Sequence, residues 1–260
     1  MSQLEKIIFN LKSKPEVDAV FITGSSGIGS DNANSDIDLG IIMNTGSDIK
    51  SLFQWVDDKP CEVHIFLDEE IKQILDKDSI SPNDPEGLIV GLLEKADIKF
   101  DKTGVLSSYK NNYENIARKL RVPENKKIWF NGVINWAYII NKRYFDSNDS
   151  EYLEALEMRL PGDISLLVKA YFEFRNIPWK GEKHVVRYLK SSDIEFYLTY
   201  KSYFKASTVE ERYCIYTKLL SLVFYGEYGL WDKDIVYPSA RDQSRLGQEN
   251  LIMYWNDLVS

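Results

Sequence analysis

The sequence is poor in the features that mark secreted and membrane proteins. Its 260 residues include only 2 cysteines, Cys61 and Cys214, which are too few for a disulfide framework. We expect two free thiols in a reducing, cytoplasmic compartment, although the sequence leaves a single disulfide open. No apolar run approaches the ~20 residues of a membrane-spanning helix. The opening segment, MSQLEKIIFNLKSKPE, is amphipathic with mixed charges, unlike a signal peptide.

The sequence also lacks a surplus of basic residues. Lys and Arg number 32 against 40 Asp and Glu, which gives a formal net charge of −8 at pH 7. A protein that follows a polynucleotide backbone needs a basic stripe, so this balance disfavours a polynucleotide partner. The charge is compatible with a cationic small substrate, although solubility alone is the simpler explanation. There is no internal repeat, and the length suits one large domain or two small ones.

What the sequence does contain is a polar turn between two apolar segments, within Phe21 to Ile42 (FITGSSGIGSDNANSDIDLGII). We expect two strands here, joined by a Gly/Ser turn and a polar loop. Side chains two apart on a strand share a face, so Asp36 and Asp38 present their carboxylates together. A divalent cation relieves their repulsion, and oxygen ligands favour Mg²⁺ or Mn²⁺. An ordinary polar turn explains Asp36 but not a second carboxylate inside the apolar run.

The turn before these carboxylates has the composition of a phosphate-binding loop. Gly24 follows the apolar run directly, and a glycine at this point lets the backbone approach a ligand closely. Backbone N–H groups in such a turn form an anion-binding concavity, to which Ser25 adds a hydroxyl donor. We therefore predict that Gly24, Ser25 and Ser26 bind a nucleotide together with the two aspartates.

A specific family pattern joins these two features. Gly24-Ser25, ten intervening residues and then Asp36-Ile37-Asp38-Leu39 resemble the signature of the polymerase-β-type nucleotidyltransferase superfamily. Within that superfamily, the length and order are most similar to the bacterial antibiotic nucleotidyltransferases, which are the aminoglycoside and lincosamide enzymes. The resemblance at motif level extends to about residue 105. Beyond that point only a helical second domain matches, without specific residues.

A third carboxylate follows on the next predicted strand. Residues 61–67 alternate in polarity, which places Glu62, His64 and Phe66 on one face. If this strand lies beside the one with the paired aspartates, Glu62 points at the same metal site. The resemblance implies a metal ligand, a general base or both at this position, whereas the alternative is an exposed Glu on an edge strand. His64 shares the face, and whether it takes part stays open.

The resemblance implies transfer of a nucleoside monophosphate, with ATP as the expected donor, to a hydroxyl group with release of pyrophosphate. Asp36 and Asp38 would hold two Mg²⁺ ions, one of them shared with Glu62, and Glu62 would accept the hydroxyl proton. The expected acceptor is a small hydroxyl-bearing molecule such as an aminoglycoside-like antibiotic, which would give a role in antibiotic resistance.

Three other functions stay open from the sequence. The acceptor is a protein in nucleotidyltransferase antitoxins, although those chains are usually much shorter. A regulatory protein would bind nucleotide without turnover, although the intact carboxylates argue against decay of the site. An enzyme that adds nucleotides to nucleic-acid ends is disfavoured by the acidic charge balance.

The predicted fold class is α+β, with a nucleotidyltransferase-type mixed β-sheet and flanking helices followed by an all-α helical bundle. We place the catalytic domain at residues 1–106 and the bundle, as the acceptor-binding domain, at residues 107–260. In the first domain a helix is also expected from Ser47 to about Asp57, and Asp101 is interpreted as a turn residue rather than a catalytic acid.

After residue 107 the strand signals vanish and helical periodicity takes over. Helices are predicted over 108–120, 124–145, 151–174, 183–203, 209–224 and 244–258, with Pro161-Gly162 breaking or kinking the third. Polar and aromatic candidates for acceptor contacts in this domain are Trp136, Glu173, Trp179, Glu182 and Lys183.

Overall fold

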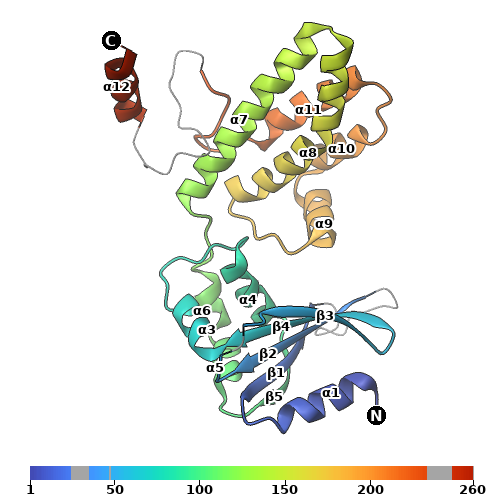
Figure 1. The fold of residues 1–260 in the computed structure, drawn as a ribbon, viewed down its shortest axis with the longest axis vertical. Coiled ribbons are helices and arrows are strands. Elements are labelled where there is room, and N and C mark those ends of the chain that lie inside the picture. The colour runs from blue at the N-terminus through green and yellow to red at the C-terminus, as the bar shows by residue number, and fades with distance from the viewer. Residues whose placement is uncertain (25–34, 47, 233–247, 260) are drawn as a thin grey trace. The chain divides into compact units, whose positions relative to one another are not determined.

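The computed structural model describes residues 1–24, 35–46, 48–232 and 248–259 (Figure 1). Two of the predicted nucleotide-binding residues, Ser25 and Ser26, lie outside this described part. The chain divides into two compact units, Met1–Arg121 and Val122–Ser260.

The first unit is built on one five-stranded sheet with the strand order β3-β4-β2-β1-β5. Its strands are β1 (Val17–Thr23), β2 (Ile37–Met43), β3 (Ser51–Val56), β4 (Lys59–Leu67) and β5 (Asp97–Asp101). β2 and β4 run parallel, whereas the β1–β2, β1–β5 and β3–β4 pairs are antiparallel. The sheet is therefore mixed, which confirms the predicted fold class.

Helices cover both faces of the sheet (Figure 1). On one face α1 (Gln3–Lys12) packs Ile8 against Val20, Ile22 and Leu39. The other face is covered by α3 (Asp68–Leu75), α4 (Pro85–Glu94), α5 (Val105–Asn111) and α6 (Tyr113–Ala117). Odd and even positions of β1 thus serve different cores, as the two-residue period of a strand requires.

The unit boundary falls after Arg121, later than the predicted boundary at 106/107. The reason is that α5 and α6 belong to the sheet's core and not to the bundle. Leu106 and Ile116, with 0% and 2% of their surface exposed, are buried in the same cluster as the α3 and α4 side chains. A backbone bridge between Ile80 and Leu120 ties the end of this segment back to the first unit.

The prediction of a helix from Ser47 to Asp57 was wrong, because the described residues of this segment contain β3. Strand β3 is exposed except for Val56, so its sequence, SLFQWV, carries no clear alternation of apolar and polar residues. A two-residue turn at Asp57 and Asp58, whose φ angles are 49° and 61°, joins β3 to β4. Positive φ at both central residues suits the twist of a tight hairpin, and Asp tolerates it better than most residues.

The second unit is helical throughout its described residues. It contains α7 (Glu124–Ser147), α8 (Ser150–Phe174), α9 (Glu182–Ser192), α10 (Ile194–Tyr203), α11 (Val209–Val223) and α12 (Gln248–Val259). Pro161 lies inside α8, so the third predicted segment is one helix and not two. The segment predicted as one helix over 183–203 is divided at Asp193, whose carboxylate accepts a hydrogen bond from the Phe196 N–H at 2.9 Å.

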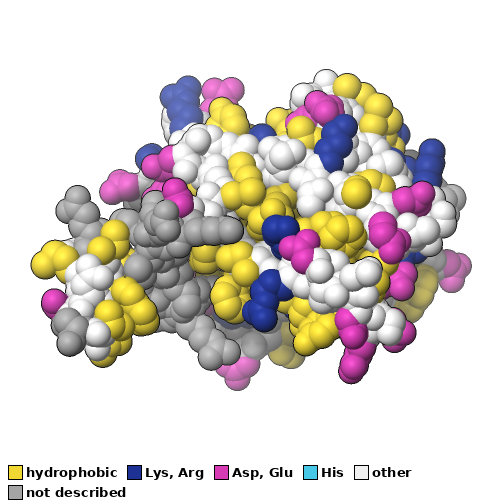
Figure 2. Space-filling model, turned by 90° about the horizontal axis from the view of Figure 1, so that it is seen from above, with side chains coloured by type: hydrophobic (Ala, Val, Ile, Leu, Met, Phe, Trp, Pro, Cys, Tyr) yellow, Lys and Arg dark blue, Asp and Glu magenta, His cyan; other side chains and the backbone are white. Residues whose placement is uncertain are grey.

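The helical unit has a large aromatic core. Phe172, Phe174, Phe196 and Tyr216 are among its most fully buried side chains. None of the helices in the described part has the length and apolar character needed to cross a membrane. On the face shown in Figure 2, Lys and Arg side chains lie scattered among acidic and hydrophobic ones instead of forming a continuous stripe.

Candidate active site

Two of the three predicted carboxylates, those of Asp38 and Glu62, meet in one row across the sheet. In the register of the strands, Thr23 of β1 lies opposite Asp38 of β2, and Asp38 lies beside Glu62 of β4. Paired residues of neighbouring strands point to the same face. This places Asp38 and Glu62 side by side on the face that carries Phe21 and Ile42, which is the face covered by α3 to α6.

Gly24 lies directly against one of these carboxylates. Its φ is +68°, and a Cβ added to it would stand 2.1 Å from the Asp38 Oδ2 atom. A side chain at this position would therefore both strain the backbone and occupy the space of the carboxylate. The preceding residue is fixed as well, since the buried Thr23 hydroxyl donates a hydrogen bond of 2.9 Å to the Leu92 carbonyl of α4.

Within the described part of the chain, Asp38, Glu62 and His64 form a cluster that could hold a metal ion. One ligand atom from each of the three side chains lies within 4.8 Å of the others. Such a spacing, with two carboxylates and an imidazole, fits a single divalent cation. Asp36 precedes the first residue of β2, is exposed, and is outside this cluster. The structure thus places Glu62 beside Asp38, the neighbourhood on which its predicted role depends, with His64 in the same cluster.

His64 lies deeper than the carboxylates. It is 6% exposed, and its ring stacks on Phe66 with the centroids 6.3 Å apart. Its Nδ1 atom is 3.8 Å from the Glu62 Oε1 atom, which is beyond hydrogen-bonding distance. The alternation of residues 61–67 had already placed His64 on this face, but only the packing shows that it is buried there.

The negative charge of the site also reaches across the sheet. Cys61, which is 1% exposed in the core beneath α1, has a thiol pKa raised to about 11. Burial is the main cause, and the nearby Asp38 carboxylate adds to it because it disfavours a second negative charge.

Asp101 serves the local structure, as predicted. Its carboxylate accepts hydrogen bonds from the Ser107 N–H at 2.8 Å and the Ser107 hydroxyl at 2.6 Å, at the start of α5. These bonds satisfy donors of the first helical turn, which otherwise have no partner within the helix.

Two of the predicted acceptor contacts in the helical unit have structural roles. Glu173 is 5% exposed and pairs with Lys126 at 3.1 Å. The Trp179 ring packs edge-on against Phe172, with the centroids 5.5 Å apart. Trp136, by contrast, is 61% exposed.

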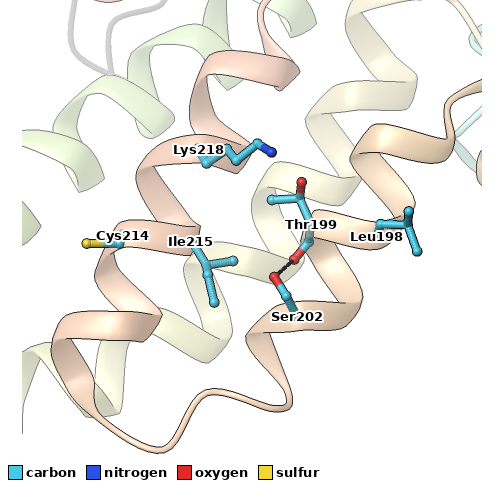
Figure 3. Close-up of a pocket in the computed structure, with 6 residues that line it drawn as sticks. All are labelled: Leu198, Thr199, Ser202, Cys214, Ile215 and Lys218. Atoms are coloured by element: carbon cyan, nitrogen blue, oxygen red, sulfur yellow. Dashed lines mark hydrogen bonds between the residues drawn. The ribbon is translucent and has the colours of Figure 1, made fainter.

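The helical unit also has an open pocket of about 400 Å³ between α10 and α11 (Figure 3). It is lined by Leu198, Thr199, Ser202, Cys214, Ile215 and Lys218. The Ser202 hydroxyl is already engaged, since it donates a 2.7 Å hydrogen bond to the Thr199 carbonyl. The lining offers neither paired carboxylates nor an acid–base pair, so this pocket lacks the chemistry seen on the sheet.

Comparison with known proteins gives a family match within the unit that carries the sheet. Residues 4–115 match the family model of the nucleotidyltransferase domain. No curated protein matches the sequence. Solved structures similar to the chain include a crystal structure of a nucleotidyltransferase-like protein from Exiguobacterium sibiricum, with 12% sequence identity and a TM-score of 0.45. That similarity covers 85% of this chain and 73% of the other.

Proposed function

We propose that this protein transfers a nucleoside monophosphate from a nucleoside triphosphate to a small hydroxyl-bearing molecule. The nucleotidyltransferase domain in residues 4–115 makes the protein a transferase. The acceptor oxygen attacks the α-phosphorus, the new O–P bond forms, and the bond to the β-phosphate breaks as pyrophosphate leaves. The acceptor proton passes to a carboxylate of the protein. ATP is the proposed donor.

The observation that carries this proposal is the row of Gly24, Asp38 and Glu62. Gly24 leaves room for the Asp38 carboxylate, and the Glu62 carboxylate lies beside Asp38 on the neighbouring strand, so two acidic ligands stand next to the segment proposed to hold the phosphates. Two nearby carboxylates in an otherwise well-packed domain are costly unless a cation or proton compensates them. The arrangement is therefore better explained by nucleotide chemistry than by stability.

Each residue has a distinct proposed role. The turn at Gly24, together with Ser25 and Ser26, binds and orients the phosphates. Asp36, Asp38 and Glu62 are the proposed ligands of two Mg²⁺ ions, which would supply charge stabilisation for the in-line displacement. Glu62 also accepts the proton of the acceptor hydroxyl. No covalent intermediate on the protein is required.

The acceptor is the second substrate of the proposed reaction. We favour a small molecule of the aminoglycoside or lincosamide type, hence a role in antibiotic resistance, with the helical unit taking part in acceptor binding. A cytoplasmic location accords with Cys61 and Cys214, which are both free thiols. A protein acceptor and nucleotide binding without turnover are the competing functions.

Pyrophosphate release tests the proposal. The protein is incubated with Mg²⁺, each nucleoside triphosphate in turn, and a panel of aminoglycosides and lincosamides. We expect acceptor-dependent pyrophosphate release that stops when Mg²⁺ is chelated. The Asp38→Asn variant is the matched control, because it removes one charge and keeps the size of the side chain. Release that is equal in both proteins would contradict the proposed site.

A further inference from the structure

The row of site residues extends to the edge strand of the sheet. In the β3–β4 pairing, Phe53 lies directly opposite Glu62, and Trp55 lies opposite Pro60. Because paired residues share a face, Phe53 stands next to Glu62 on the side that carries Asp38. Trp55, two residues on, shares that face at the end of the sheet where Asp36 precedes β2.

These two aromatic rings are exposed to an unusual degree. Phe53 is 77% exposed and Trp55 is 68% exposed. Solvent exposure of large rings is unfavourable, and it is informative when it occurs beside polar groups that bind a ligand. Leu52, whose side chain points to the α1 face of the same strand, is 38% exposed and has no carboxylate opposite it.

The β3–β4 hairpin, which carries the rings, is held in position by hydrogen bonds at its turn. The Asp57 carboxylate accepts hydrogen bonds from the N–H groups of Gln3 and Leu4 at 2.8 and 3.0 Å, at the start of α1. The Asp57 N–H donates in return to the Gln3 side-chain oxygen at 3.1 Å. The edge strand is thus anchored to a helix that packs on the sheet, so the rings belong to a fixed surface.

The reaction geometry decides which substrate meets this surface. Across the sheet the order is Gly24 with Thr23 on β1, then Asp38, then Glu62, then Phe53. An in-line displacement has the attacking oxygen and the leaving pyrophosphate on opposite sides of the phosphorus. If the pyrophosphate is held at the Gly24 end, the attacking hydroxyl comes from the Glu62 end. The acceptor molecule then extends over β3.

We infer that Phe53 and Trp55 form an aromatic platform that binds a ring of the acceptor and not the nucleobase. This inference rests on the proposed function of the Gly24–Asp38–Glu62 row. Aromatic faces stack on planar rings and attract cationic groups, and two of them side by side favour a cyclic molecule over an open chain. The acceptor class is therefore a ring compound that carries its reactive hydroxyl on or near that ring.

Steady-state kinetics test the platform with whichever panel members the wild-type protein modifies. For Phe53→Ala and Trp55→Ala we expect the KM for the acceptor to rise about tenfold, while the KM for the triphosphate stays within about twofold. Phe53→Tyr should restore the wild-type KM, whereas Phe53→Leu should not, because it keeps apolar area but not a flat ring. Leu52→Ala is the matched control on the opposite face of β3, and it should leave both KM values unchanged. A rise in the triphosphate KM alone would overturn the inference in favour of a nucleobase site.

A binding measurement separates failure of the platform from failure of the proposed reaction. The protein is labelled with 5-fluorotryptophan, and the ¹⁹F signal of Trp55 is assigned by its loss in Trp55→Phe. We expect the signal to stay in place with Mg²⁺ and α,β-methylene-ATP and to shift when a cyclic panel member is added, even if no turnover follows. A shift with nucleotide alone, or no shift with any panel member, would refute the platform.

Self-association is the other explanation for an exposed edge strand, and the same variants address it. Sedimentation of the wild-type protein and of Phe53→Ala should give the same mass at micromolar concentration. A dimer that Phe53→Ala dissociates would assign these rings to a second copy of the chain and overturn the inference.

Discussion

Gly24 and Asp38 occupy adjoining space so closely that a single added carbon on Gly24 would stand 2.1 Å from the Asp38 Oδ2 atom. The atom in the way is the end of a short side chain, so Gly24→Ala can be accommodated if the carboxylate turns aside. We expect the variant to fold and to lose turnover at least tenfold. Part of its loss of stability, ~1–2 kcal/mol, comes from the positive φ of +68° at this residue.

Gly104→Ala is the matched control for this prediction. Gly104 has a φ of +74°, but a Cβ there meets nothing within 4 Å. It should show a similar loss of stability in thermal unfolding and keep its activity. Equal activities of the two variants would mean that the contact between Gly24 and the Asp38 carboxylate has no catalytic role.

Substitutions of the two aspartates of the motif should have the same effect on catalysis but different effects on stability. Asp38→Asn and Asp36→Asn are each expected to abolish pyrophosphate release, because each removes a proposed metal ligand. The melting temperature should hold or rise, more so for Asp38→Asn, since Asp38 lies beside Glu62 and loses a like-charge neighbour. If Asp36→Asn retains near-normal turnover, the cluster of Asp38, Glu62 and His64 alone constitutes the site.

Substitutions of Glu62 and of His64 should distinguish the roles of the two residues, because we expect them to change the rate by different amounts. Glu62→Gln should lower the turnover number by at least the ~10²-fold typical of losing a general base, with little change in nucleotide affinity. His64→Gln should cost little turnover, because Asp36, Asp38 and Glu62 are the proposed metal ligands and Glu62 is the proposed base. The pH dependence of the rate is the second measurement. The two roles would be exchanged if Glu62→Gln stays active with a low-pH limb in its rate while His64→Gln is inactive.

The carboxylate of Asp57 should make stability depend on pH in the acid range. Hydrogen bonds from the Leu4 and Gln3 backbone lower the Asp57 pKa below its ordinary value of 3.8. A lowered pKa means that the folded protein favours the charged form. The contribution is therefore complete above pH 3.8 and is lost as the pH falls through the lower, folded pKa.

Thermal unfolding as a function of pH checks this sign. Asp57→Asn should melt at a lower temperature than the wild type at neutral pH, and the difference should shrink on acidification below the ordinary pKa. Asp58→Asn is the neighbouring control in the same turn, and it should leave the melting temperature nearly unchanged. A constant difference at all pH values would show that the charge of Asp57 is irrelevant to the anchor.

The two cysteines should react very differently with an alkylating agent. Cys61 is 1% exposed with a pKa raised to about 11, so its thiolate is scarce at pH 8, whereas Cys214 is exposed. We expect iodoacetamide to label only Cys214 in the native protein and both residues in denaturant, as read by peptide mass spectrometry. Native labelling of Cys61 would contradict the burial of that strand.

The sequence by itself determined the elements whose side chains repeat with a clear period. The residues of β1, β2 and β4 either alternate in polarity or form apolar runs between turn residues, and the helices of the second unit show helical spacing of apolar residues. The α+β class was therefore predictable, and so was the alignment of Glu62, His64 and Phe66 on one face. The proposed motif was equally local, because Gly24, Asp36 and Asp38 lie close together in the sequence. Local chemistry also identified Asp101 as a turn residue.

The tertiary structure decided what depends on register and on burial between distant segments. β3 is exposed on both faces, so its sequence holds no periodic signal, and only its pairing with β4 makes it a strand. The same pairing places Phe53 beside Glu62, a relationship between residues nine positions apart that no local pattern contains. The end of the first unit at Arg121 depends on Leu106 and Ile116 entering the core of the sheet. Apolar periodicity shows that a helix buries one face, but the partner of that face is fixed only when the whole chain packs.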